Sequence, residues 1–355
     1  MPPTGSIRQP FQSDRGPSGY SELLREIRGR GLLQPSPRYY VLLGAINILG
    51  LALVVAGLVL LRDSWATLVL APLYAVVSTQ IAFFSHDAAH RQIARGGRAT
   101  AVLCLVHGNL LNGFSYGWWL AKHNAHHAHP NDLEVDPDVA AGAFVFDSEQ
   151  AGARTGPGAW LTRHQAGLFF PMLTLEALNL RATSVRTVLR PGLRHRKAER
   201  LLLLGHFALY ATLLISTMTW IQAVVFFVVH QGLSGLYLGC SFAPSHKGMP
   251  VLTPEQAADP LLRQVLTSRN IRGGRVLGFA LGELNLQIEH HLFPSMPRPN
   301  LRRARPIIRE HCRARGISYA EASLLESYGM ALRHLHQVGD PLRRHAAADT
   351  MRSRR

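Results

Sequence analysis

Four long apolar stretches divide the chain into two pairs. The first runs over 41–61 without a formal charge, and the second over 65–85. Two more follow over 201–218 and 220–243, with only Thr219 between them. About 20 consecutive apolar residues are enough for a helix to cross the hydrocarbon core of a bilayer. The pattern therefore predicts an all-α integral membrane protein, with four transmembrane helices arranged in two hairpins.

Other apolar segments are too short or too interrupted to be full spans. Residues 101–120 contain several polar residues and the pair Trp118-Trp119, which favours a re-entrant or interfacial position. Residues 159–190 carry a short apolar run flanked by charges, which predicts another interfacial helix. Over 21–33, leucine and isoleucine alternate with arginine. We expect an amphipathic helix there, either at the membrane interface or packed on the body of the protein.

The polar segments at both ends define the domain organisation. Residues 1–18 are rich in Pro, Gly and Ser and are expected to be disordered. The sequence predicts a cytosolic N-terminal segment over 1–38, a membrane domain over 39–340 and a basic C-terminal tail over 341–355. Within the membrane domain, residues 300–336 are expected to be helical and soluble.

The chain is strongly basic, with a formal net charge of +16. The apolar spans favour a membrane partner over nucleic acid. Basic residues gather in the N-terminal segment and over 86–200 and 244–355, whereas the other two connections carry only Arg62. By the positive-inside rule, both termini are expected to face the cytoplasm. Nearly all basic residues are arginines, which is typical of a GC-rich genome, and we expect a bacterial plasma membrane. The only lysines are Lys122, Lys197 and Lys247.

Histidines form three tight clusters in segments that adjoin the predicted spans. Their members are His86 and His90; His123, His126 and His127; and Gln287, His290 and His291. Positions i, i+3 and i+4 lie on one face of an α-helix, so three helices can present these side chains to a common centre. Seven imidazoles exceed the ligands of one tetrahedral zinc site, which predicts two metal ions. Imidazole suits iron, zinc, copper and nickel, so the residue types leave the metal open.

Carboxylate and amide side chains near the clusters are candidates to orient the ligand imidazoles. They are Asp87, Asn124, Asp132, Glu134 and Glu289. Metal-bound histidines usually donate their second ring N–H to such a group. No catalytic side chain is expected beyond the metal centre itself.

The motifs HDAAH, HNAHH and QIEHH resemble the three histidine boxes of integral-membrane fatty acid desaturases. The flanking sequences FAPSHKG and HLFPSMPR resemble that family too, and the similarity covers roughly 20–340. Gln287 stands where many relatives have a histidine, which is typical of acyl-lipid and front-end desaturases. It is expected to be a weak oxygen ligand or to orient a bound water. The resemblance implies two iron ions held by eight histidines: His86, His90, His123, His126, His127, His246, His290 and His291.

The resemblance also implies the chemistry. The di-iron centre would use dioxygen and two electrons to introduce a cis double bond into a fatty acyl chain, carried as a lipid or as a CoA ester. Many front-end relatives have a fused haem domain marked by His-Pro-Gly-Gly, but the only His-Pro here is His129-Pro130. Electrons are therefore expected from a separate carrier such as ferredoxin. The implied architecture is the four-helix scaffold with a cytosolic helical cap that holds the histidine-ligated di-metal site.

Two alternatives stay open. A fatty acyl or lipid hydroxylase on the same scaffold begins with the same C–H abstraction, and the histidine boxes do not separate the two outcomes. A metal-binding or metal-transporting membrane protein is a different class. Transporter ligands lie near the bilayer midplane, whereas these clusters adjoin the span ends.

Two histidines, His206 and His230, lie inside predicted spans, which is uncommon and points to function. They stand at similar distances on either side of Thr219, so they are expected to face each other. They would hydrogen-bond between the spans or line the route to the acyl chain; bis-histidine haem ligation is the alternative. His107 is a further candidate to approach the metals. The remaining histidines are expected on the surface: His129, His164, His195, His311, His334, His336 and His345.

Overall fold

The computed structural model describes residues 19–344, so the segment predicted to be disordered and most of the basic tail lie outside the described residues. Helices dominate the described part of the chain. The two strands found there are very short: β1 (Asn270–Ile271) pairs in parallel with β2 (Glu321–Ala322). Apart from this pair, the all-α prediction holds.

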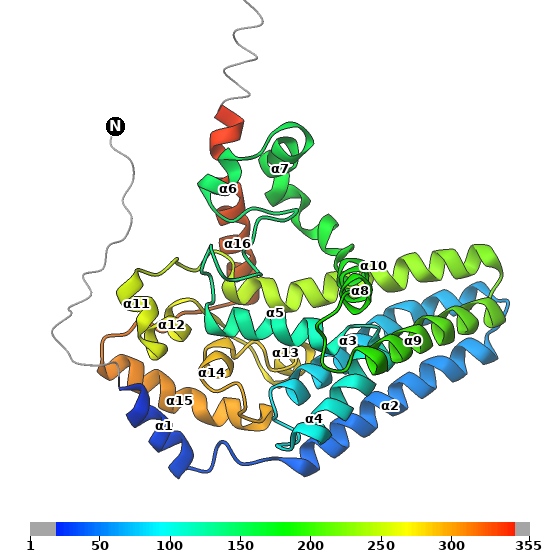
Figure 1. The fold of residues 1–355 in the computed structure, drawn as a ribbon, viewed down its shortest axis with the longest axis horizontal. Coiled ribbons are helices and arrows are strands. Elements are labelled where there is room, and N and C mark those ends of the chain that lie inside the picture. Colours follow the sequence, from blue (N-terminus) through cyan, green and yellow to red (C-terminus); the bar gives the residue numbers. More distant parts are fainter. Residues whose placement is uncertain (1–18, 345–355) are drawn as a thin grey trace, which may run out of the picture.

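Within residues 19–344, four helices are long and apolar enough to cross a membrane. They are α2 (Pro37–Leu60), α3 (Leu70–Ala89), α9 (Arg196–Thr217) and α10 (Trp220–His246), with the short 3-10 helix η1 (Trp65–Val69) leading into α3. They extend together toward the right in Figure 1. Their outward faces carry exposed leucine, isoleucine and valine side chains, as lipid-facing surfaces do. The four predicted spans are confirmed as helices, each with bounds a few residues different.

The packing between these helices differs from two separate hairpins. α2 and α3 pack along each other, but α10 packs mainly against α3 and α8 (Glu176–Leu189). A capping box of Thr219 and Gln222 starts α10 and makes the turn from α9 possible. At that far end the two loops meet, because the Asp63 N–H donates to the Thr217 carbonyl at 2.9 Å. The helices therefore form one bundle.

Gly235 of α10 lies close to the backbone of a neighbouring helix junction. A Cβ added there would lie 2.6 Å from the Leu173 carbonyl oxygen and 2.9 Å from the Ala177 nitrogen, at the junction of α7 (Gly156–Leu173) and α8. Gly235→Ala is expected to lower the free energy of unfolding by about 1–3 kcal/mol, because backbone atoms cannot move aside easily. Gly232→Ala, on the same helix, would meet only Thr174 Cβ at 3.9 Å and should be neutral or slightly stabilising. Thermal unfolding in detergent micelles checks this, and equal melting temperatures of the two variants would contradict it.

The interrupted segment forms a helical return. α4 (Gly97–Cys104) continues into the π-helix η2 (Leu105–Leu110), and the chain then reverses into α5 (Tyr116–Ala128). The reversal uses Gly113 at φ +76°, where a Cβ would lie 2.6 Å from the ring of His206. Neither α4 with η2 nor α5 is long enough to span a bilayer. The prediction that residues 101–120 do not form a full span agrees with the structure.

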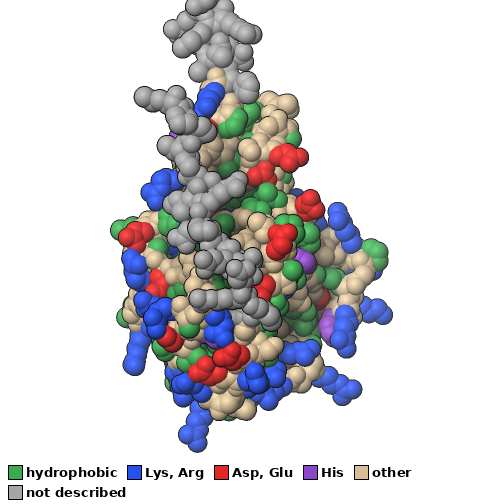
Figure 2. Space-filling model, turned by 90° about the vertical axis from the view of Figure 1, so that its left-hand side faces the viewer, with side chains coloured by type: hydrophobic (Ala, Val, Ile, Leu, Met, Phe, Trp, Pro, Cys, Tyr) green, Lys and Arg blue, Asp and Glu red, His purple; other side chains and the backbone are tan. Residues whose placement is uncertain are grey.

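The remaining elements gather at one end of the four helices (Figure 1). They include α11 (Pro254–Ala258), α12 (Pro260–Leu266), α13 (Arg275–Ala280), α14 (Gln287–Leu292) and α15 (Arg298–Ala314). Buried apolar residues of α12, α14 and α15 form a common core. Figure 2 shows that lysine and arginine side chains are spread over this end, with acidic side chains between them.

The N-terminal helix packs on this core. α1 (Tyr20–Gly29) buries Leu23 and Ile27 completely against the core of α14 and α15. The apolar face of α1 is therefore covered by protein. The prediction that this helix lies at the membrane interface is wrong, and the alternative, that it packs on the body of the protein, is confirmed.

A second group of helices projects at the top of Figure 1. It consists of α6 (Ser148–Gly152), α7 (Gly156–Leu173) and α16 (Leu324–Val338). α7 packs against α16 and α10. One interfacial helix was predicted over 159–190, but the structure has two helices there, α7 and α8. Similarly, 300–336 contains α15, β2 and α16.

Candidate metal centre

Four elements bring histidines to one place. The last turn of α3 carries His86, and His90 is its C-cap residue. α5, which starts on an N-cap hydrogen bond from the Trp118 N–H to the Ser115 hydroxyl, presents one face of histidines. The short α14 supplies the third box, and the end of α10 supplies His246. Helical spacing thus turns each sequence cluster into a patch of imidazoles.

The ligand atoms form two compact groups, within each of which they lie no more than 4.8 Å apart. The first group is His86, His90, His123 and His290, and the second is His126, His246 and His291. The ring of His127 lies between them, with its centroid 4.7 Å from that of His90 and 4.2 Å from that of His291. All eight histidines named from the sequence therefore meet at one centre.

Three of the buried Nε2 nitrogens at this centre lack hydrogen-bond partners among the described residues. His86 Nε2, His290 Nε2 and His291 Nε2 are buried and have no hydrogen bond among the described residues. Leaving a buried polar atom unpaired costs about 1–3 kcal/mol. His90 Nε2 and His123 Nε2 are only 2.8 Å apart, so a proton or a metal must lie between their lone pairs. These observations fit a metal-binding site.

On three of the ligand histidines, Nδ1 is held by the surrounding protein. His86 Nδ1 lies 3.1 Å from Asp87 Oδ1, and His291 Nδ1 lies 2.9 Å from Gln264 Oε1. His246 Nδ1 lies 3.1 Å from the Thr267 carbonyl oxygen. Such contacts fix the tautomer with the proton on Nδ1, so that the Nε2 lone pair is available to a metal or, at His246, to the Gln287 amide.

The electrostatics also favour metal binding. Burial lowers the pKa of His90, His123, His127, His290 and His291 well below the usual histidine value, and neighbouring imidazoles lower it further. These rings are therefore neutral near pH 7, which is the protonation state that binds metals.

A buried ion pair supports the first group from behind. Arg298 at the start of α15 pairs with Asp87, and both side chains are almost inaccessible, with exposed fractions of 2% and 1%. Asp87 in turn contacts His86. Tyr40 on α2 accepts a hydrogen bond from the Arg298 backbone N–H at 3.2 Å and donates one to Gln92 at 2.6 Å. These contacts join α2, α3, which carries the first histidine box, and α15, which follows the third box in the chain.

Asp136 supports the second group. Its carboxylate lies 2.9 Å from His126 Nδ1 and accepts hydrogen bonds from the backbone N–H groups of Asn131 and Asp138, each at 2.8 Å. Burial opposes ionisation of Asp136, but the hydrogen bonds and the charge of His126 outweigh it and lower the pKa of the carboxyl. The ionised form is thus ready to orient His126.

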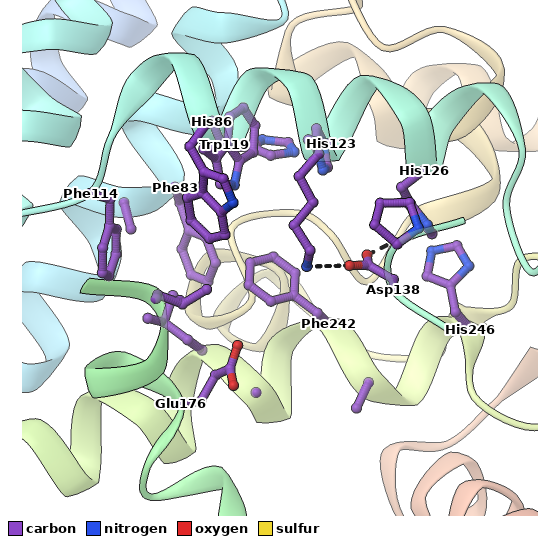
Figure 3. Close-up of a pocket in the computed structure, with 18 of the residues that line it drawn as sticks. Phe83, His86, Phe114, Trp119, His123, His126, Asp138, Glu176, Phe242 and His246 are labelled. Carbon is purple, nitrogen blue, oxygen red and sulfur yellow. Dashed lines mark hydrogen bonds and ion pairs between the residues drawn. The ribbon is translucent and has the colours of Figure 1, made fainter. Parts of the chain in front are cut away.

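An elongated cavity of about 290 Å³ follows α5 beside the histidines (Figure 3). Its wall contains histidines of both groups, which are His86, His123, His126 and His246, together with Gln287. The rest is mostly aromatic or apolar, including Phe83, Phe114, Trp118, Trp119, Phe144 and Phe242. Such a cavity suits a long apolar ligand with a few polar contacts.

Gln287 lies beside the second group, next to His246. Its side-chain Nε2 is 2.9 Å from His246 Nε2. It also lines the cavity, so its amide can reach both a metal ligand and a bound molecule.

Of the five residues predicted to orient the ligand imidazoles, Asp87 alone has a described side-chain contact with one of them. Asp87 contacts His86, but Asn124 is exposed, and the Asp132 carboxylate accepts from the Glu134 backbone N–H rather than from a ligand histidine. Glu289 is fully buried and binds Asn270 and Tyr319 rather than a ligand histidine. Sequence reasoning missed Asp136, Gln264, Thr267 and Arg298 in this role. Only Asp136 carried a signal, since it belongs to the same acidic loop as the two residues chosen.

The intramembrane histidines do not face each other directly. His206 Nδ1 lies 2.9 Å from the Leu110 carbonyl oxygen, and the Tyr210 hydroxyl lies 2.7 Å from His230 Nδ1. Tyr210 stands between the two rings. His230 therefore hydrogen-bonds between the spans through Tyr210 of α9, and His206 bonds to the backbone of η2 instead. The same packing argues against a haem between them.

Several other histidines differ from their predicted positions. His107 stacks on Phe84 at 4.4 Å and is in neither metal group. His311 is buried at 7% exposure, so it is not a surface residue, whereas His195 and His334 are partly exposed. His345 lies outside the described residues.

Asp136→Asn is expected to weaken metal binding by about 10–100-fold, because the amide stabilises the Nδ1–H of His126 less than the carboxylate does. Asp132→Asn, in the same loop but without a histidine contact, should leave it unchanged. Metal retention during titration with a chelator checks this. Equal retention by the two variants would contradict the role given to Asp136.

Comparison with known proteins places these features in a wider group. Residues 63–323 match the model of a protein family described as fatty acid desaturase. The chain is 30% identical over 321 residues to an acyl-lipid (9-3)-desaturase of Physcomitrium patens, covering 87% of this chain and 60% of the relative. It is 26% identical to the Delta(6)-fatty-acid desaturase fat-3 of Caenorhabditis elegans, covering 92% and 76%. It is 28% identical to Delta(8)-fatty-acid desaturase 2 of Arabidopsis thaliana, covering 89% and 73%. The chain thus spans about three fifths of the length of the moss relative.

Proposed function

Because this chain belongs to the fatty acid desaturase family, we propose that it is a di-iron, dioxygen-dependent fatty acyl desaturase that introduces a cis double bond. One observation carries the proposal: members of both histidine groups form the wall of a single aromatic cavity. A methylene chain lying in that cavity would be held next to both groups.

The proposed reaction balances with dioxygen, two electrons and two protons. The acyl chain loses two hydrogens from adjacent methylenes, and dioxygen is reduced to two waters. Iron bound by the eight histidines would supply the activation of dioxygen and the removal of hydrogen. His86, His90, His123 and His290 would hold one ion, and His126, His246 and His291 the other, with His127 between them.

The protein's own part is to position the chain and keep water away. Trp119 packs flat against His123 with ring centroids 4.3 Å apart, so a ligand-bearing wall is stiffened by an aromatic neighbour. Phe83 and Phe242 stand on the side of the cavity opposite α5 (Figure 3). Each buried methylene contributes only about 0.8 kcal/mol. The position of the double bond must therefore be set by where the chain stops, rather than by affinity for individual methylenes.

The electrons are proposed to come from a separate carrier such as ferredoxin. The basic end of the molecule that holds the metal centre would attract an acidic protein (Figure 2). This end, with both termini, is proposed to face the cytoplasm. The relatives compared above come from a moss, a nematode and a flowering plant. The bacterial plasma membrane stays a prediction.

Expression in a host without the activity, followed by mass spectrometry of its lipids, tests the proposal. A desaturase yields acyl chains lighter by two hydrogens, with a double bond at a defined position. Chains heavier by one oxygen would mean that the protein is a hydroxylase, and unchanged lipids with active electron donors present would contradict both.

A further inference from the structure

Lysine is scarce in this chain, and two of the three lysines meet at the cavity. Lys122 lies on α5 and Lys247 follows the last residue of α10, yet both reach Asp138 in the loop after α5. The third, Lys197, is exposed near the start of α9 and is not in the cavity lining. A lysine ammonium is a compact donor, unlike the planar fork of the arginines found almost everywhere else.

Both ammonium groups keep unused donors. Lys122 Nζ forms an ion pair with the Asp138 carboxylate. Lys247 Nζ donates to the Asp138 backbone carbonyl at 2.7 Å and lies 4.0 Å from the centre of the Phe146 ring. An ammonium carries three N–H donors, and the described hydrogen bonds use one on each lysine. Asp138 therefore holds both lysines in place and leaves donors for a further acceptor in the cavity.

The two ends of the cavity differ in polarity. Lys122 and Lys247 contact Asp138 at one end, close to His246, whereas Phe114 lines the other. In Figure 3, Phe114 lies far from Asp138 and His246, with Trp119 and Phe83 between them. A ligand with one polar end and a long apolar tail fits this arrangement in only one direction.

We propose that Lys122 and Lys247 bind the carbonyl oxygen at the carboxyl end of the acyl chain, whose methyl end then points toward Phe114. This assignment rests on the proposed desaturase function and adds the direction of the substrate. Lys122 directly precedes His123 and lies one helical turn before His126. The methylenes that follow the bound carbonyl therefore pass the histidine wall first, and the double bond is counted from the carboxyl end.

The test compares lysine variants of the purified full chain. Lys122→Met and Lys247→Met remove the donors, Lys122→Arg keeps a cationic donor, and Lys197→Met is the matched control. Each is assayed on a saturated acyl chain carried as an oxygen ester of phosphatidylcholine and as a CoA thioester. The KM, the double-bond position, the iron content and the melting temperature are measured together.

Lys122→Met is expected to raise KM about tenfold, because one charge-assisted hydrogen bond to the substrate is lost. It should also give products with double bonds at neighbouring positions, because the chain can slide. Lys122→Arg should restore a single position, and Lys197→Met should behave like the unmodified protein. A KM effect on only one of the two substrates identifies which carbonyl is bound.

Methionine variants that retain the original KM and a single double-bond position would overturn the assignment. So would variants that lose iron and thermal stability in proportion to activity while their remaining product is unaltered, since the lysines would then be structural. An unmodified protein that forms no alkene contradicts the proposed function itself. Normal turnover with unaffected lysine variants contradicts only the direction of the substrate.

Discussion

His126→Ala and His290→Ala are each expected to reduce the rate of desaturation more than about a hundredfold. This loss exceeds the roughly 10–100-fold effect expected when only a residue that orients a ligand is removed. Each variant removes a nitrogen from a different histidine group, so each should also lose iron. Both residues lie outside the four long helices, on α5 and α14, so insertion into the membrane should be unaffected. Product formation, iron content and membrane fractionation of the same preparations measure these effects.

The control for these variants is His336→Ala. The His336 side chain is 63% exposed and belongs to neither histidine group, so its loss should be nearly silent. Substantial turnover of either His126→Ala or His290→Ala would refute the assignment of the two groups as a metal centre.

Arg298→Met is expected to be the most destabilising single change, with a loss of about 3–5 kcal/mol of unfolding free energy. The variant leaves the carboxylate of Asp87 buried without its cationic partner. Since Asp87 also contacts His86 Nδ1, iron affinity should fall together with stability. Thermal unfolding in detergent and iron content after dialysis check the two effects.

A surface pair provides the comparison. Arg272 pairs with Glu326 at 2.8 Å, with both side chains more than half exposed, so Arg272→Met should cost less than about 1 kcal/mol. The double variant Asp87→Asn with Arg298→Met should lose less stability than the two single losses added together, since both remove the same pair. Similar melting temperatures for Arg298→Met and Arg272→Met would be incompatible with a buried ion pair behind the metal site.

The parts of the fold that depend on composition and spacing could be predicted from the sequence. Charge-free stretches of sufficient length became the four long helices, and HNAHH became one histidine-bearing face of α5. Both follow from local geometry, because helix length and the i, i+3, i+4 pattern do not depend on distant residues. His246 was found only through the family resemblance, since a lone histidine has no spacing to mark it.

The parts that depend on tertiary contacts could not be predicted. An amphipathic pattern in α1 cannot tell whether lipid or another helix covers Leu23 and Ile27. The partners of the imidazoles are set by which loop folds back, so Asp136 was passed over for its neighbours. Tyr210 was not considered between His206 and His230, because similar depth on two helices does not determine their rotation.

We propose that the two histidine groups hold two irons beside the cavity. Metal analysis of the purified, active protein, with alkene formation followed on the same sample, tests it most directly. One iron for each histidine group is predicted, with turnover that rises in proportion to iron and requires dioxygen. Full turnover with a single metal ion per chain, or with none, would contradict it.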